Sequence, residues 1–151
     1  MSAQPTRRDT VRLLCKHLIS RLEHQGVIEF SPKLRQQVQD ELWGQIAKVI
    51  LTDEDFRERA LAQVGGKAEE IQDSRFTETE AYRAARNLIK SELGQEELNG
   101  FYFQQNLRIV AKLVREYFMS SSLVDDVFET DEEIERRVVE MIQRFKPEDM
   151  H

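Results

Sequence analysis

The sequence contains few of the residues that cross-link or interrupt a chain. Its 151 residues include one cysteine, three prolines and six glycines. A single cysteine cannot form an intramolecular disulfide, and this fits a reducing compartment. An all-β sandwich needs many turns, and this chain has few of the prolines and glycines that form them. We therefore expect a helical chain that is not stabilised by disulfides.

Long apolar runs are missing as well. No stretch of about 18 apolar residues occurs, so the sequence predicts no membrane span and no membrane partner. Near the N-terminus, Arg7 and Arg8 are followed by a stretch that Arg12, Lys16 and His17 interrupt. This stretch lacks the continuous apolar core of a signal peptide. Together these absences predict a cytoplasmic protein.

The charge and the composition favour a single helical domain. The formal net charge is −6, which disfavours a duplex DNA binder because phosphate contacts need a basic surface, although a local basic patch is compatible with it. Charged residues make up 33% of the chain, which suits helices with solvated outer faces. The length suits one ordinary domain. We predict a single helical domain over residues 6–146, with frayed tails at 1–5 and 147–151.

Apolar residues recur at helical spacing along most of the chain. Segment 103–120 has the widest apolar face, and a helix that is apolar over much of its circumference is usually central. The polar stretch 67–74 is the best candidate for a linker. We predict an all-α, single-domain bundle of five to six helices around the central helix 103–120. The expected helices cover about residues 6–25, 32–49, 53–64, 78–93, 103–120 and 131–145.

Several residues mark the ends of these helices. Ser31 before a proline is a strong helix start, and Thr130 with Glu133 has the spacing of a capping box. Gly26 supplies a left-handed stop. Gly44 lies inside a helical pattern, where glycine costs about 1 kcal/mol relative to alanine. Close packing against another helix is one explanation for it.

The two ends of the chain carry similar patterns. Segment 12–29 aligns without gaps with the segment that begins at residue 108, in the order helix, polar turn, hydrophobic pair, acid and second helix. This order predicts two pseudo-symmetric helical hairpins, 7–50 and 103–145. Coincidence between two similar amphipathic hairpins is an equally weighted alternative. If the hairpins are related, Leu22 and Phe118 should both be buried.

No motif for catalysis, metal binding or cofactor binding is complete. His17 and His24 could share a helix face, but no nearby cysteine or spaced carboxylate completes a zinc site. The acidic stretch from Asp125 has Thr130 where an EF-hand loop needs glycine. No phosphate-binding glycine loop or nucleophile elbow is present. Cys15 lies in an apolar register and is predicted to be a buried hydrophobe. We predict no catalytic, cofactor-binding or metal-binding residues and no enzyme activity.

Basic residues recur with helical spacing on three of the expected helices. Such faces could converge on an anionic partner. The alternative, which the net charge favours, is that they are solvated faces paired with acids elsewhere. The basic residues are Arg8, Arg12 and Lys16 on the first helix, Arg83, Arg86 and Lys90 on the fourth, and Arg108, Lys112 and Arg115 on the fifth.

A helical scaffold without a catalytic constellation predicts a non-catalytic protein-interaction or adaptor module with an unidentified protein partner. The alternative is a nucleic-acid- or ribosome-associated protein that binds RNA through the three basic faces. A homo-oligomer is a further option, because Phe118 and Met119 could face a second subunit as well as a core. The candidate partner-binding residues are Arg8, Arg12 and Lys16 on the first helix, and Asp125, Asp126 and Glu129 in the acidic segment.

Three parts of the chain carry a resemblance to a known family. They are HQGVIE at 24–29, LTDED at 51–55, and the C-terminal run with LRIVA at 107–111, LVDDVF at 123–128 and DEEI at 131–134. On these segments the chain resembles an uncharacterised bacterial family of domains of unknown function, number five hundred and seven in its series. The resemblance covers nearly the whole chain. It implies a bacterial cytosolic protein and no known activity, cofactor or catalytic residue.

Overall fold

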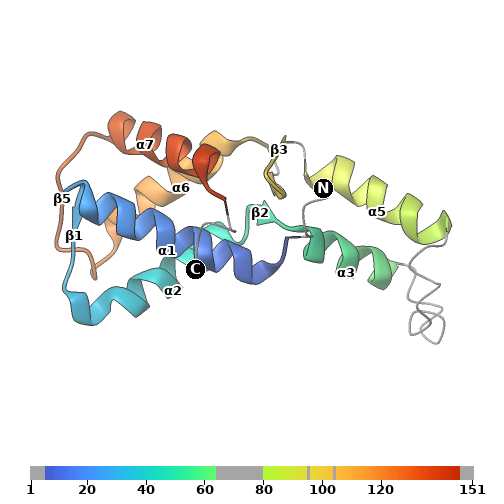
Figure 1. The fold of residues 1–151 in the computed structure, drawn as a ribbon, viewed down its shortest axis with the longest axis horizontal. Helices are drawn as coiled ribbons and strands as arrows, with labels where there is room; N and C mark the ends of the chain where they lie inside the picture. Colours follow the sequence, from blue (N-terminus) through green and yellow to red (C-terminus); the bar gives the residue numbers. More distant parts are fainter. Residues whose placement is uncertain (1–5, 64–79, 95, 104, 147–151) are drawn as a thin grey trace.

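The computed structural model describes residues 6–63, 80–94, 96–103 and 105–146. These residues are mostly helical, as predicted, and they also form five short strands. The helices are α1 (Arg8–His24), α2 (Arg35–Ile46), α3 (Asp53–Gln63), α5 (Glu80–Leu93), α6 (Leu107–Ser120) and α7 (Asp131–Arg144), with a 3₁₀ turn at Pro32–Leu34 before α2. The molecule is elongated (Figure 1), with α1, α2, α6 and α7 at one end and the pair α3 and α5 at the other. The predicted linker 67–74 and the predicted tails 1–5 and 147–151 lie outside the described residues.

The four helices α1, α2, α6 and α7 form a bundle. α1 packs against α2, α2 against α6, α6 against α7, and α7 against α1, so that the neighbours close a ring. Leu14 and Leu18 of α1, Val110 of α6 and Val138 of α7 have no exposed surface. Burying a side chain of this kind contributes about 1.5–3 kcal/mol. The centre of this ring is therefore the main hydrophobic core.

The two hairpins of the bundle bury matching positions. Leu22 and Phe118 are both buried, as predicted. Between the hairpins, β1 (Ile28–Glu29) pairs antiparallel with β5 (Asp126–Val127). In this pair Ile28 lies opposite Val127, and Glu29 lies opposite Asp126. The duplication itself stays a prediction. Four further aligned pairs are buried: Val11 and Leu107, Leu14 and Val110, Cys15 and Ala111, and Leu18 and Val114.

A small sheet replaces the predicted start of the central helix. The helix expected over 103–120 begins only at Leu107, because Phe103 belongs to a strand. The three aromatic residues of that strand are all buried, and aromatic residues favour strands because they pack well on a pleated, half-buried surface. The expectation of a purely helical bundle is corrected accordingly. The sheet is antiparallel with the order β2–β4–β3, and its strands are β2 (Ile50–Leu51), β4 (Phe101–Phe103) and β3 (Glu96–Leu98).

The small sheet joins the two ends of the molecule (Figure 1). Successive strand residues point to opposite faces. Phe103 accordingly belongs to the bundle core, whereas Tyr102 belongs to a second hydrophobic cluster with Leu51 and Phe56. The rings of Phe56 and Tyr102 meet edge to face, with centroids 4.7 Å apart. Ile89 and Leu93 of α5 pack on this second cluster, which thereby holds α3 and α5 to the sheet.

The helix ends test three of the boundary predictions. Gly26 has φ +75 just after α1, and Val27 N–H donates to the Leu22 carbonyl at 2.9 Å, as in a Schellman motif. The Thr130 hydroxyl accepts a hydrogen bond from the Glu133 backbone N–H at 3.2 Å, as the capping box predicts. The packing explanation for Gly44 is wrong, because a Cβ added there would meet no heavy atom within 4 Å.

Candidate functional site

Arg8, the first candidate binding residue, is paired within the chain. Its guanidinium lies 3.0 Å from Glu54 Oε1 and 3.4 Å from Asp55 Oδ1, and it also contacts Glu58. All three carboxylates belong to α3. Arg8 therefore links the start of α1 to α3, and the carboxylates of α3 largely neutralise its charge.

Arg12 and Lys16 lie further along α1, beside α2. The Arg12 guanidinium is 3.3 Å from Asp40 Oδ1, and it lies over the Trp43 ring at 4.1 Å from the centroid. Lys16 is exposed and forms no ion pair with any described residue. Of the predicted basic face on α1, only Lys16 therefore presents an unmatched charge.

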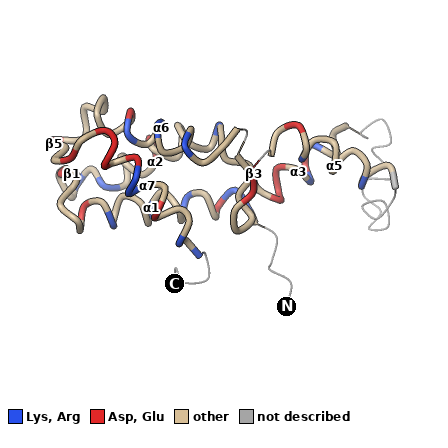
Figure 2. The backbone as a smooth tube through the Cα atoms, turned by 90° about the horizontal axis from the view of Figure 1, so that it is seen from above, with Lys and Arg blue, Asp and Glu red and all other residues tan. Residues whose placement is uncertain are grey.

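The other two basic faces are also partly matched. Arg86 of α5 is 3.9 Å from Asp53, and the Lys90 ammonium lies 4.7 Å from the Tyr102 ring centroid. Arg115 of α6 is 3.0 Å from Glu135. Figure 2 shows basic and acidic residues interspersed along the described backbone. Where the chain is described, the predicted basic residues that form no ion pair lie on three different helices: Lys16 on α1, Arg83 and Lys90 on α5, and Arg108 and Lys112 on α6.

The acidic candidates lie at the turn end of the bundle. The Asp125 backbone N–H donates to the Glu29 carbonyl at 2.8 Å, and the Asp126 carboxylate accepts from Val127 N–H at 2.8 Å. Both side chains are exposed, and neither pairs with a described cation. Glu129, in contrast, is 3.2 Å from Arg137. Because Arg8 lies at the opposite end of α1 (Figure 1), the structure does not bring the two predicted surfaces together.

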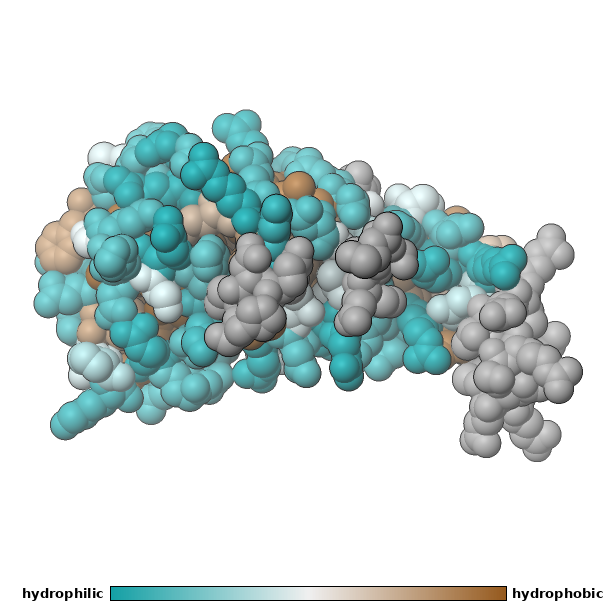
Figure 3. Space-filling view, in the orientation of Figure 1, coloured by the Kyte–Doolittle hydropathy of each residue, from teal (hydrophilic) through white to brown (hydrophobic). Residues whose placement is uncertain are grey.

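The turn end of the bundle is also where apolar side chains reach the surface. The face in Figure 3 is mostly hydrophilic, and apolar side chains gather at the end where β1 and β5 lie. Phe128, directly after β5, is 54% exposed. The exposure of Phe128 could not be predicted from the sequence, because a single phenylalanine near a turn can be either buried or exposed.

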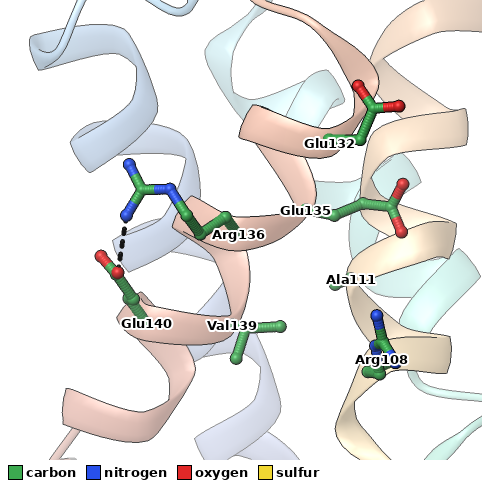
Figure 4. Close-up of a pocket in the computed structure, with 7 residues that line it drawn as sticks. All are labelled: Arg108, Ala111, Glu132, Glu135, Arg136, Val139 and Glu140. Carbon is green, nitrogen blue, oxygen red and sulfur yellow. Dashed lines mark hydrogen bonds and ion pairs between the residues drawn. The ribbon is translucent and has the colours of Figure 1, made fainter.

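A groove of about 600 Å³ lies between α6 and α7 (Figure 4). Its apolar lining consists of Ala111 and Val139, and Val139 points from α7 toward α6. Ala111 is almost completely buried, so its small side chain leaves space where a longer one would fill the groove. The charged residues of the lining are Arg108, Glu132, Glu135, Arg136 and Glu140.

Most charges along the groove are neutralised by neighbours. The Arg136 guanidinium is 2.6 Å from Glu140 and also contacts Glu133. Hydrogen bonding from Arg136 lowers the pKa of Glu133, so this acid stays ionised. Glu135 is 3.0 Å from Arg115. These ion pairs hold the side chains of the groove walls in place.

Two groove charges are left without a partner among the described residues: Glu132 and Arg108. Glu132 is in the first turn of α7 and Arg108 in the first turn of α6. In Figure 4 they lie at opposite ends of the groove. Val139 lies opposite Arg108 at the basic end, and Ala111 and Glu135 lie between the two ends. Glu132 and Val139 were missed from the sequence because their significance depends on which helix lies beside α7.

A buried polar network near the small sheet has only internal partners. Tyr102 Oη donates to Asp53 Oδ1 at 2.7 Å, and Thr6 N–H donates to Asp53 Oδ2 at 2.9 Å. The Thr6 hydroxyl donates to the Gly100 carbonyl at 2.6 Å and accepts from Asp53 N–H at 3.0 Å. Burial, and then the contact with Asp53, raise the pKa of Tyr102, which therefore stays a hydrogen-bond donor. The network ties the N-terminal segment to α3 and to the β3–β4 turn.

Cys15 is buried, as predicted. Burial raises the pKa of its thiol to about 12. We expect Ellman's reagent to label the native protein at least about a thousandfold more slowly than the unfolded one, because labelling requires opening of the core. The control is a free thiol measured in the same buffer. Labelling of Cys15 at the rate of a free thiol would contradict its burial.

The same pKa shift has a pH consequence. In the folded protein the pKa of the Cys15 thiol lies above its ordinary value of 9.0, so the folded state binds this proton more tightly than the unfolded state. The resulting contribution to the free energy of unfolding is fully present below pH 9 and is lost as the pH rises toward 12. Cys15→Ala should make this part of the stability curve shallower. The slope that remains should come from groups such as Tyr102 and Tyr117, whose pKa values burial also raises.

The described residues contain no group of three or more histidine, cysteine, aspartate or glutamate side chains placed to hold a metal ion. No described helix is both long enough and apolar enough to cross a membrane.

Comparison with known proteins gives no relative: no family model, no curated protein and no solved structure matches the sequence. The resemblance described above therefore stays a prediction. Any functional interpretation depends on the geometry of this chain alone.

Proposed function

We propose that this protein is a non-catalytic interaction module whose α6–α7 groove receives a helix of a partner protein. The observation that carries the proposal is the groove itself, which contains the apolar residues Ala111 and Val139 and has at its two ends an acid, Glu132, and a base, Arg108, that pair with no described residue. Helix-in-groove recognition uses an apolar floor for affinity. Charges at the rim set the orientation and the association rate. A bacterial cytosolic setting, which the resemblance implies, is part of the same proposal.

The chemistry of the groove specifies the partner. A side chain bearing a positive charge fits beside Glu132, where the first turn of α7 also carries Asp131 and Glu133. A side chain bearing a negative charge fits beside Arg108. Small or apolar residues of the partner face Ala111 and Val139. The expected partner segment is therefore an amphipathic helix with a basic end and an acidic end.

The groove walls are already ordered before a partner binds. Arg136 is fixed by Glu133 and Glu140, and Glu135 by Arg115. Pre-ordered side chains lose less conformational entropy on association, which favours affinity. This supports the groove over the exposed acidic turn, where Asp125 and Asp126 have no cation to order them within the described chain.

The charge-swapped variant Arg108→Glu with Glu132→Lys tests the proposal. It keeps the net charge of −6 and reverses both ends of the groove. We expect it to lose capture of the partner by at least about tenfold, because each end would then face a like charge. Helicity should persist, since an unfavourable charge in a first helical turn costs only about 0.3–1 kcal/mol. Pull-down with quantitative mass spectrometry, checked by circular dichroism, measures both.

The matched control swaps two exposed, unpaired charges away from the groove, Lys16→Glu with Asp125→Lys. It leaves the net charge unchanged and should leave capture unchanged. Reversing the charges at the two ends of the captured helix should restore binding to the groove variant. Capture that survives the groove swap but is lost in the control would move the binding surface to the α1 face or the acidic turn, as the sequence first suggested.

The RNA-binding alternative stays a prediction. Ion pairs neutralise Arg8, Arg12, Arg86 and Arg115. The predicted basic residues that pair with no described acid are spread over α1, α5 and α6. Its test is the salt dependence of RNA binding, which falls steeply with salt when several phosphates are contacted.

A further inference from the structure

A second hollow, of about 250 Å³, lies on the other side of α7, between α7 and α1. Four arginines line it: Arg21 from α1, and Arg136, Arg137 and Arg144 from α7. One carboxylate, Glu140, also lines it, and that carboxylate is 2.6 Å from Arg136. In a chain with a net charge of −6, this excess of guanidinium groups around one hollow stands out.

Two of these four arginines have no counter-ion among the described residues. Arg136 pairs with Glu133 and Glu140, and Arg137 pairs with Glu129 at 3.2 Å. Arg21 and Arg144, in contrast, form no ion pair with any residue that the structure describes. They face the hollow from two different helices, α1 and the last turn of α7. Two positive charges that share a hollow repel each other, and an anion bound between them removes the repulsion.

The rest of the hollow is fixed in place. Arg137 donates to the side-chain oxygen of Gln25 at 2.8 Å, which ties the end of α1 to α7. Its Nε lies 3.1 Å from Glu133. At the other end the rings of His17 and Phe145 are in contact, with centroids 5.3 Å apart. The walls are therefore held by α1–α7 contacts that do not involve Arg21 or Arg144.

We propose that this hollow binds a small free anion carrying a phosphate group, held by Arg21 and Arg144 beside His17. A guanidinium presents a planar fork of donors that matches phosphate oxygens in pairs. Pockets for drug-sized ligands measure about 300–1,000 Å³. A hollow of about 250 Å³ therefore suits inorganic phosphate, pyrophosphate or a small phosphate ester. The hollow shares Arg136 and Glu140 with the α6–α7 groove, but the two arginines proposed to hold the anion, Arg21 and Arg144, do not line the groove. The anion site therefore goes beyond the function proposed above.

His17 provides an internal reporter of the anion. Burial, and then the charge of Arg21, lower the pKa of His17, so the ring is neutral at neutral pH. The charged groups around the hollow are Arg21 on α1 together with Arg136, Arg137, Glu140 and Arg144 on α7. A bound dianion offsets the arginines and favours the imidazolium form. Saturation with the ligand should therefore raise the pKa of His17.

The test titrates the full chain with inorganic phosphate and with pyrophosphate by calorimetry, at constant ionic strength set with sodium chloride. We expect saturable pyrophosphate binding that weakens about tenfold or more in Arg21→Gln and again in Arg144→Gln, because each removes a charge-assisted contact. The matched control is Arg83→Gln, which removes an exposed, unpaired arginine of α5 and should bind like the wild type. NMR titration of His17 should show its pKa rising with pyrophosphate.

Three outcomes would overturn the proposal. The first is the absence of saturable binding by the folded wild type. The second is equal affinity in Arg21→Gln, Arg144→Gln and Arg83→Gln, which would indicate general charge attraction only. The third is a short RNA that binds more tightly than pyrophosphate and weakens equally in all three variants, which would assign binding to distributed phosphate contacts. Neither Arg21 nor Arg144 lines the α6–α7 groove, so each of these results leaves the partner-helix proposal standing.

Discussion

Phe118→Ala is expected to lower the free energy of unfolding by about 3–5 kcal/mol. Phe118 is 2% exposed and lies in the bundle core, and its ring meets that of Tyr117 edge to face at 5.4 Å. The loss combines the transfer energy of the ring with the cavity left behind, because a closed ring of four helices can relax only partly. It is a large share of the 5–15 kcal/mol typical of domains. Urea denaturation followed by circular dichroism measures it.

The neighbouring residue provides the control. Met119 is 52% exposed, so Met119→Ala should change stability by less than about 0.5 kcal/mol. Leu22→Ala removes the side chain at the aligned position of the first hairpin and should cost about 2–5 kcal/mol. If Phe118→Ala and Met119→Ala had similar effects, the packing of α6 described here would be wrong. If Met119→Ala alone were destabilising in a concentration-dependent way, Met119 would face a second copy of the chain.

Gly100→Ala is expected to be the second most damaging change, at about 2–4 kcal/mol. Gly100 has φ +87, a conformation that L-residues rarely adopt, and an added Cβ would lie 2.4 Å from Thr6 Cγ2. Thr6 cannot turn away easily. Its hydroxyl donates to the Gly100 carbonyl and accepts from Asp53 N–H, so rotation would break the network. Thermal and urea unfolding measure the loss.

Gly44→Ala is the matched control for this change. Gly44 lies within α2, where an added Cβ meets nothing within 4 Å. Alanine there should stabilise the protein by up to about 1 kcal/mol, because glycine is the poorer helix former. Opposite signs for the two glycine substitutions are therefore expected. Gly100→Ala with wild-type stability would show that the Thr6 contact gives way without cost.

The features that were predicted from the sequence are local or periodic. Gly26 and Thr130 act through residues within one helical turn, so their roles follow from neighbouring letters. The buried register of α1 and α6 follows from helical spacing, which is why Leu22 and Phe118 were placed in the core.

What the sequence did not predict depends on distant partners. Phe103 follows two other apolar residues, and such a continuous apolar run has neither helical nor strand periodicity. Its strand is completed by pairing with Ile50, which is distant in the sequence. Arg8 looked like a free basic residue because Glu54 and its neighbours belong to another helix. Each proposed site lies between two helices whose packing against each other cannot be predicted from a local sequence pattern. The sequence therefore did not identify Glu132 or Arg21 as a binding residue.

The ring of helices has a consequence for the order in which the protein can be made. α1 leaves the ribosome before α7, yet α7 covers it, and β1 pairs with β5, which is also made much later. Synthesis proceeds at about 5–20 residues per second, so the roughly one hundred residues between these partners take on the order of 5–20 seconds to appear. During that interval the α1–α2 hairpin carries an uncovered apolar face and an unpaired strand edge. Stability should therefore arise late and abruptly, when α7 emerges, and a nascent chain stalled before residue 131 is the form most exposed to aggregation or chaperone binding.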